Sequence, residues 1–159
     1  MIKILDGYRL APDVSFQCKA LSIGRGAVIH NRVTFLGDSI TIGDNVWIGQ
    51  DCILDGTGGL TIGDNVTIGF GSYIHTHAGT RGFVRKAAPV SIGDCSWLMS
   101  RVSVNPGVKI GRDVLVYNTA LVAGDVPDSS IAAGSPAKVI GKVPKGELMS
   151  SFLAKKGLK

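Results

Sequence analysis

The sequence contains three histidines, and two of them, His75 and His77, close a regular stretch at residues 62–77. Imidazole has an unperturbed pKa near neutrality, so a histidine can accept and release a proton at physiological pH. His77 stands where the regular spacing of aliphatic residues stops and a polar, basic segment begins. A titratable side chain at the break of a scaffold repeat predicts a functional site on a rigid frame.

The other two histidines show weaker signals. His75 directly follows Ile74 and points away from the core if the strand continues, where it would line a cleft or assist His77. His30 directly follows Ile29 in an earlier repeat, and we expect its side chain to be solvated.

A six-residue repeat is the element that must position these side chains. The dipeptide Ile-Gly recurs at Ile23, Ile42, Ile62, Ile92 and Ile110. Each isoleucine is followed after six and after twelve residues by another large apolar side chain, as in Ile62, Ile68 and Ile74. Three hexads make eighteen residues, whereas the blocks begin 19, 20, 30 and 18 residues apart. The differences imply insertions of one, two and twelve residues.

Three successive hexads predict one coil of a triangular solenoid. Each short strand directs its aliphatic residue inward, and a small or β-branched residue four places later fills the corner. These corner residues are Ala27, Val46, Val66, Ser96 and Val114. A period of six fits neither a helix nor simple alternation, and a single coil cannot bury its own faces. The sequence therefore predicts an all-β fold, a β-helix whose stacked strands pair in parallel.

Two segments depart from the hexads before the last coil. Residues 1–20 are less regular and are expected to form an N-terminal cap over the core. Residues 78–89 form the one large insertion and are expected to leave the solenoid as a protruding loop, where binding residues often lie.

The C-terminal end is expected to be a short helix. Leu148, Phe152 and Leu153 line one face of a helix within residues 145–156, so we expect this helix to cap the core. The chain then divides into a β-helix domain at residues 1–144 and a helical tail at residues 145–159.

Composition excludes several classes of protein. Apolar residues make up 45% and charged residues 18%, which argues against disorder, and 22 glycines favour strands and turns. The net charge of +5 is modest and lies partly at the C-terminal end, so we expect no nucleic-acid partner, although anionic small molecules remain compatible.

The cysteines and the N-terminal end indicate a cytoplasmic protein. Cys18, Cys52 and Cys95 are odd in number and widely spaced, so we expect buried, reduced thiols and no metal site. The N-terminal residues lack a signal-peptide pattern, and no apolar run has the length of a membrane span.

The chain resembles the hexapeptide-repeat acyltransferases, whose fold is a left-handed parallel β-helix. The similarity covers about residues 20–142 and points to the branch of maltose, galactoside and polysaccharide O-acetyltransferases. Its most specific motifs are Ile-Gly-Asp-Asn-Val-Trp-Ile-Gly at 42–49, Gly-Gly-Leu-Thr-Ile-Gly-Asp at 58–64, Thr-His at 76–77, Asn-Pro-Gly-Val-Lys-Ile-Gly at 105–111 and Ala-Ala-Gly-Ser-Pro-Ala-Lys-Val-Ile at 132–140.

This resemblance implies a function and a site. His77 matches the family histidine that ends a coil before the inserted loop, and its implied role is the general base that removes the proton from a sugar hydroxyl. Trp97, Ser100 and Lys138 match positions near the acetyl-CoA channel. The family also implies a homotrimer with active sites between subunits, acetyl-CoA as cosubstrate and a role in polysaccharide biosynthesis.

Some expectations concern the acceptor and the departures from the family pattern. We expect His75, Arg81 and Arg85 to contact the acceptor, and Lys86 adds charge on the same loop. The last coils differ from those of relatives at Met99, Tyr117, Asn118, Ala123 and Gly124, where larger side chains or a lost lysine affect the CoA channel.

Three alternatives remain open. In the first alternative, the acceptor group is an amine, and the protein is an N-acetyltransferase that acts on an amino sugar. In the second, the altered coils make it a non-catalytic scaffold. The third is the γ-type carbonic anhydrases, which hold zinc with histidines of neighbouring subunits, but the spacing of His75 and His77 does not match theirs.

Overall fold

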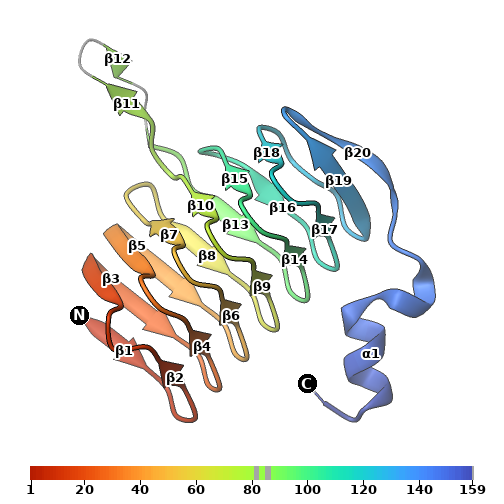
Figure 1. Ribbon diagram of the computed structural model, residues 1–159, viewed down its shortest axis with the longest axis horizontal. Coiled ribbons are helices and arrows are strands. Elements are labelled where there is room, and N and C mark those ends of the chain that lie inside the picture. Colours follow the sequence, from red (N-terminus) through yellow and green to blue (C-terminus); the bar gives the residue numbers. More distant parts are fainter. Residues whose placement is uncertain (81–82, 85–86, 159) are drawn as a thin grey trace.

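The hexads form the coils of a triangular solenoid in the computed structural model, which describes residues 1–80, 83–84 and 87–158 (Figure 1). The first face is built from β2 (Arg9–Leu10), β4 (Val28–Ile29), β6 (Trp47–Ile48), β9 (Thr67–Ile68), β14 (Trp97–Leu98), β17 (Leu115–Val116) and β19 (Ser130–Gly134). The second face contains β7 (Ile53–Asp55), β10 (Tyr73–Ile74), β15 (Ser103–Val104) and β18 (Leu121–Val122). The third contains β1 (Ile2–Ile4), β8 (Leu60–Ile62), β13 (Val90–Ile92) and β16 (Lys109–Ile110).

Two long strands, β3 (Ser15–Ile23) and β5 (Thr34–Ile42), bend continuously from the second face onto the third. Neighbouring coils pair in parallel on every face, as predicted, with Ile48 opposite Ile68 and Ile68 opposite Leu98. The N-terminal residues already belong to this register because Ile2 lies opposite Leu21. The segment predicted as an irregular cap therefore contains the strands of a first coil.

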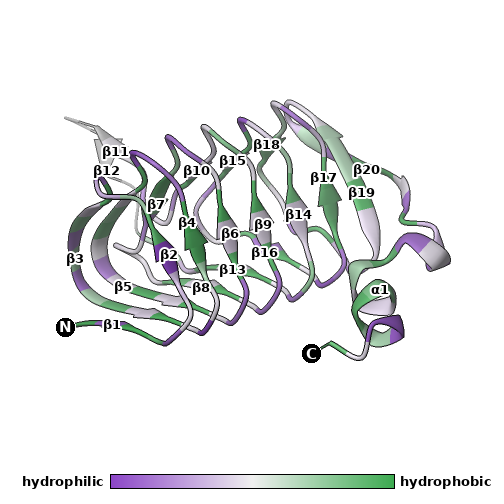
Figure 2. Ribbon diagram, turned by 60° about the horizontal axis from the view of Figure 1, so that its bottom comes forward, coloured by the Kyte–Doolittle hydropathy of each residue, from purple (hydrophilic) through white to green (hydrophobic). Residues whose placement is uncertain are grey.

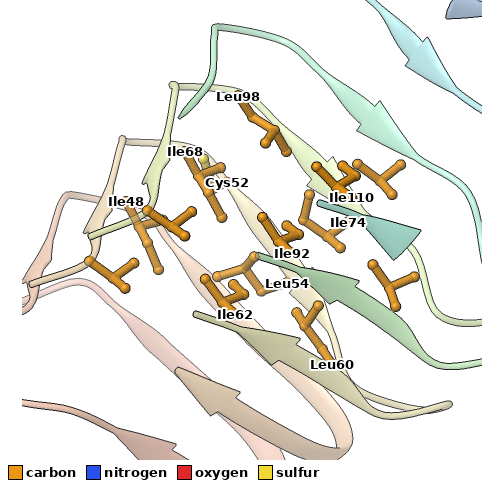
Figure 3. Packing of buried hydrophobic residues seen from close by; sticks show 14 of the residues in the cluster. Ile48, Cys52, Leu54, Leu60, Ile62, Ile68, Ile74, Ile92, Leu98 and Ile110 are labelled. Atoms are coloured by element: carbon orange, nitrogen blue, oxygen red, sulfur yellow. The ribbon is translucent and has the colours of Figure 1, made fainter. Parts of the chain in front are cut away.

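The core is a column of inward hexad residues. Ile48, Leu54, Ile62, Ile68 and Ile74 are almost completely buried and pack on one another inside the coils (Figure 3). The predicted corner residues are buried as well. Hydrophobic segments such as β4 and β17 lie between hydrophilic corners of the coils (Figure 2). Each fully buried aliphatic side chain contributes about 1.5–3 kcal/mol to folding.

Hydrogen bonds between successive coils explain the Ile-Gly-Asp motif at one corner of the solenoid. The backbone N–H of Asp44 donates to Asp64 Oδ1 at 2.7 Å, and that of Asp64 donates to Asp94 Oδ1 at 2.8 Å. A Cβ on Gly43 would lie 2.2 Å from Asp64 Oδ1 and 2.8 Å from the Asp64 backbone nitrogen. Glycine is required here because the carboxylate of the next coil occupies the space of a side chain.

Substitution of Gly43 by alanine should therefore lower the free energy of unfolding by about 1–3 kcal/mol, as overpacking typically does. Chemical denaturation followed by circular dichroism measures the change. The matched control is Gly124→Ala, because a Cβ there meets nothing within 4 Å. Equal stability of the two variants would contradict the explanation.

The insertions of one, two and twelve residues all fall at the corner between the second and third faces, which we call the insertion corner. They follow Phe35, Leu54 and Ile74, and the next coil turns there without an insertion. The largest carries the antiparallel strands β11 (Gly79–Thr80) and β12 (Phe83–Val84), which protrude as predicted (Figure 1). The insertion corner is thus the irregular edge of a regular frame.

The C-terminal segment differs from the prediction. β20 (Ala137–Lys142) folds back antiparallel on β19, followed by a 3-10 turn at Lys145–Glu147 and α1 (Met149–Lys155). The short helix exists, but Phe152 is 52% exposed and no residue of α1 is buried, so the helix does not cap the core. Instead, the backbone N–H and the hydroxyl of Ser150 donate to the carboxylate of Asp113 at 2.9 and 2.7 Å.

The cysteine prediction holds for two of the three residues. Cys52 and Cys95 are buried and free, and burial raises the pKa of the Cys52 thiol to about 11. Cys18 is also free but only partly buried. Its position explains the difference, because Cys18 pairs with Gly37 of the next coil, whereas β1 pairs with β3 only from Leu21 onward and leaves the other side of Cys18 uncovered by that strand.

Candidate active site

The insertion corner holds a histidine–carboxylate pair. His77 Nδ1 lies 2.7 Å from Asp55 Oδ2. The imidazole of His77 is 44% exposed, whereas the carboxylate of Asp55 is only 1% exposed. The structure therefore places one ring nitrogen of His77 against a buried acid and leaves the ring accessible to a substrate.

Backbone and hydroxyl groups fix the carboxylate of Asp55. Its Oδ1 accepts hydrogen bonds from the backbone N–H and hydroxyl of Thr57 at 3.0 and 2.7 Å. Its Oδ2 accepts from the backbone N–H and hydroxyl of Thr76 at 2.8 and 3.1 Å and from the His77 N–H at 3.1 Å. The Thr76 hydroxyl also accepts from the Gly58 N–H at 2.8 Å. Both insertion turns are thus tied to one carboxylate.

These hydrogen bonds determine the charge of the pair. Burial alone would raise the pKa of Asp55, but the bonds from Thr57, Thr76 and His77 outweigh it and hold the pKa well below its ordinary range. An ionised carboxylate can only accept, so we assign the proton on the facing nitrogen of His77 to Nδ1. That tautomer leaves Nε2 with a free lone pair, as a general base requires.

Asp55 was not identified from the sequence, although a signal was available. It directly follows inward Leu54 at the start of the two-residue insertion, and Leu54 pairs with Ile74. The carboxylate and the histidine therefore occupy the same corner in successive coils. Insertions at the same hexad position in neighbouring coils are the feature of the sequence from which Asp55 could have been identified.

His75 lies beside this pair without a hydrogen bond to it. Its ring stacks on Tyr73, with ring centroids 3.7 Å apart and an angle of 25° between the planes. Burial lowers the pKa of His75; the charge of Asp55 opposes this effect and His77 adds to it. The structure thus brings His75 and His77 together at one edge, as the sequence indicated.

The predicted donor residues lie elsewhere on the chain. Trp97 is 45% exposed on the first face, where it lines a cavity of about 170 Å³ together with Leu115 and Met149. Ser100 follows β14 at the corner between the first and second faces, and Lys138 lies on β20 opposite Ala133. One chain therefore does not place these three residues beside His77.

The corner that contains Ser100, which we call the basic corner, has features that the sequence did not indicate. The guanidinium of Arg101 lies 5.5 Å from the ring centroid of Phe70, which is 41% exposed. The backbone N–H of Ser100 donates to Asn118 Oδ1 at 2.9 Å. One altered residue of the last coils therefore occupies a backbone donor at this corner.

The third histidine differs from its prediction. His30 is not solvated, because its Nε2 is buried without a hydrogen-bond partner and its ring lies against Trp47, with centroids 4.6 Å apart. Trp47 pairs in register with Val28, two residues before His30, and its ring covers the imidazole from that diagonal position. The predicted acceptor residues Arg81 and Arg85, together with Lys86, lie outside the described residues.

Neither a cluster of metal ligands nor a membrane-spanning helix occurs in the described part of the chain. Within residues 1–80, 83–84 and 87–158, no group of three or more histidine, cysteine or acidic side chains is arranged to hold a metal ion. Among the helices of these residues, none combines the length and the apolar character needed to cross a membrane.

Comparisons with known proteins agree with the fold. The family model described as "Hexapeptide repeat of succinyl-transferase" matches residues 39–76. Galactoside O-acetyltransferase of Escherichia coli K12 is 31% identical over 124 residues, which are 77% of this chain and 54% of that protein. A protein of the same strain, provisionally named a colanic acid biosynthesis acetyltransferase, is 36% identical over 123 residues, or 74% and 67% of the two chains. This chain thus spans about half to two thirds of these relatives.

A solved structure supports the fold over its whole length. AntD, an N-acyltransferase from Bacillus cereus in complex with dTDP and 3-hydroxybutyryl-CoA, superposes with a TM-score of 0.82 at 20% identity. The similarity covers 97% of this chain and 92% of AntD. The left-handed parallel β-helix expected from the resemblance is therefore confirmed as the fold.

Proposed function

Because the chain belongs to the hexapeptide-repeat acyltransferase family, we propose that it transfers an acetyl group from acetyl-CoA to a hydroxyl of a sugar or glycan precursor. The observation that supports this proposal most strongly is the pair of His77 and buried Asp55, joined at 2.7 Å. The similarity to a galactoside O-acetyltransferase supports a sugar acceptor.

The geometry suggests how the pair acts. Nε2 of His77 removes the proton of the acceptor hydroxyl as its oxygen attacks the thioester carbonyl, which forms a tetrahedral intermediate. Collapse of that intermediate breaks the carbon–sulfur bond, and the CoA thiolate takes the proton back from the imidazolium. Asp55 accepts the Nδ1–H bond throughout and stabilises the positive charge on His77. No covalent acyl-enzyme is needed because the thioester is already activated.

The carboxylate favours a hydroxyl acceptor over an amine. A sugar hydroxyl is a poor nucleophile unless a base removes its proton, whereas a neutral amine can attack without such help. N-acetylation of an amino sugar remains the second candidate, because AntD is an N-acyltransferase with the same fold. The third candidate, a scaffold without activity, is favoured by the contact between Asn118 and the Ser100 N–H.

The direct test combines the protein, acetyl-CoA and a panel of sugar acceptors. Release of the CoA thiol and the mass of the product report transfer, and treatment with mild alkali cleaves an O-acetyl ester but not an amide. An alkali-stable product would overturn O-acetylation. Absence of both transfer and acetyl-CoA binding would favour the scaffold.

The basic corner is our candidate for the donor site. CoA carries phosphates and an adenine ring, and an exposed aromatic ring beside a guanidinium suits both groups. Arg101 over Phe70 supplies that combination. Lys138 on β20 adds a cation at the end of the solenoid. Trp97 and Ser100 retain the roles that the resemblance implies.

A homotrimer would bring the two corners together. Within one chain His77 lies at the insertion corner and Ser100 at the basic corner, so a site containing both needs a second copy. The outward row of the third face is polar, with Thr41, Thr61 and Ser91, whereas the first face exposes Trp47 and Trp97. An apolar face suits contact between subunits. Free cysteines and the use of acetyl-CoA support a cytoplasmic location.

Mixing of inactive chains tests this arrangement. Chains with His77→Gln and chains with Arg101→Glu, each inactive alone at low acetyl-CoA, should regain about a quarter of the wild-type rate when co-expressed, since random assortment restores that share of sites. The control pair, His77→Gln with Asp55→Asn, alters the same corner and should regain no activity. No recovery in the first mixture would contradict a site shared between subunits.

A further inference from the structure

Tyr73 and His75 form an aromatic pair on the outer surface beside the catalytic pair of His77 and Asp55. Ile74 between them is completely buried, and side chains alternate along a strand, so both rings lie on the outside of β10. Both residues are half-buried, and their rings stack with centroids 3.7 Å apart. The aromatic pair therefore presents a fixed surface next to the insertion corner.

Polar groups border this surface on the next coil, and the catalytic pair borders it at the insertion corner. Tyr73 pairs in register with Ser103, and His75 donates its N–H to Val104 O at 2.9 Å, which places Asn105 beside it. On the preceding coil, Ile74 lies opposite Leu54, whose successor is Asp55. A hydroxyl and an amide thus flank the aromatic pair on the side away from Asp55.

Such a mixture of groups matches one class of molecule. A pyranose ring has an apolar face of C–H groups, which packs on aromatic rings, and an edge of hydroxyls, which bond to hydroxyl and amide side chains. Burial lowers the pKa of His75, which disfavours a positive charge on this surface. A neutral sugar ring is therefore favoured over an anionic ligand at this place.

We propose that the stacked pair of Tyr73 and His75 is the platform on which the pyranose ring of the acceptor lies, with a ring hydroxyl directed to Nε2 of His77. This inference rests on the proposed function and specifies its acceptor subsite. Tyr73 supplies the apolar contact, Ser103 and Asn105 lie where ring hydroxyls would meet them, and the catalytic pair lies at the edge where the proton is removed.

The key variant is Tyr73→Leu, which keeps an apolar side chain at this position and removes the aromatic ring. Loss of one aromatic contact should raise the acceptor KM about tenfold and leave the KM for acetyl-CoA unchanged. Tyr73→Phe should behave like the wild type. Thr61→Ala on the third face serves as the control, and thermal melting confirms that each variant is folded.

A binding experiment separates this inference from the proposed function. Saturation-transfer NMR with methyl glycosides of glucose, galactose, mannose and N-acetylglucosamine measures binding without any reaction. Binding that Tyr73→Leu weakens about tenfold supports the platform even if no acetyl group is transferred, and that result would contradict only the proposed function. Equal acceptor KM in wild type and Tyr73→Leu, or no binding of any glycoside by the wild type, would overturn the platform.

Discussion

Replacement of His77 by glutamine should lower kcat for acetyl transfer by about 10²–10⁴-fold, the usual contribution of a general base. Glutamine keeps the polarity and approximate size of the side chain but cannot take up a proton. The proposed donor groups lie at another corner of the solenoid, so the affinity for acetyl-CoA should not change. Release of the CoA thiol at saturating acceptor measures kcat, and a thermal shift with acetyl-CoA measures binding.

The control for this prediction is His30→Gln. It removes the same type of side chain from an early coil, at a place without a carboxylate partner in the described structure. This variant should keep the wild-type kcat. A His77→Gln enzyme with unchanged turnover would contradict the role of His77 as the base. A parallel loss of acetyl-CoA binding would instead indicate that the variant disturbs the fold.

The β-helix fold could be predicted because the large apolar residue of each hexad marks a position in the core. Ile48, Ile68 and Leu98 are spaced by whole coils in the sequence, and the structure buries all three in one register. Insertions do not disturb this pattern because they leave the solenoid at one corner. The repeat therefore allows the fold to be predicted from a single sequence.

The position of the C-terminal helix could not be predicted from the repeat. Apolar spacing predicted a helix correctly but assigned it to the core end, whereas Phe152 is exposed. A polar contact helps to hold α1 in place and joins Ser150 to Asp113 across 37 residues. A short helix outside the repeat has no register with the coils, so its position depends on contacts that spacing does not encode.

Only one member of the candidate catalytic pair, His77, was predicted from the sequence, for a related reason. His77 stands at a visible break of the repeat, whereas Asp55 lies 22 residues earlier in a turn that looks like ordinary glycine-rich loop. The two meet because coils stack in register, and their bond depends on how both insertion turns fold. The roles of Trp97, Ser100 and Lys138 stay predictions.

Asp55→Asn is the second substitution with a large expected effect. An amide in place of the carboxylate can donate to His77 Nδ1, which would place the ring proton on Nε2 and block its use as a base. We expect kcat to fall by about 10²–10⁴-fold even though His77 itself is intact. Asp51→Asn is the control, because that carboxylate pairs with Arg32 at the corner between the first and second faces, whereas His77 lies at the insertion corner. Wild-type kcat in Asp55→Asn would show that Asp55 does not orient the base.

The same substitution should alter stability in a pH-dependent way. The amide of the Asp55→Asn variant would leave N–H and hydroxyl donors of Thr57 or Thr76 without an acceptor, at a cost of about 1–3 kcal/mol. The folded-state pKa of Asp55 lies below the ordinary value of about 4. A depressed carboxyl pKa contributes stability that is present above the unfolded-state pKa and is lost as the pH falls through the folded-state value.

Urea unfolding of the wild type and Asp55→Asn should therefore differ most at neutral pH and converge as the pH falls below about 4. Convergence follows because the protonated wild-type carboxyl loses its advantage in accepting six hydrogen bonds. A stability difference that stays constant across this range would mean that the carboxylate charge is not what holds the two insertion turns. The orientation of His77 would then need another cause, because we assign to the Asp55 charge both the holding of the insertion turns and the orientation of His77.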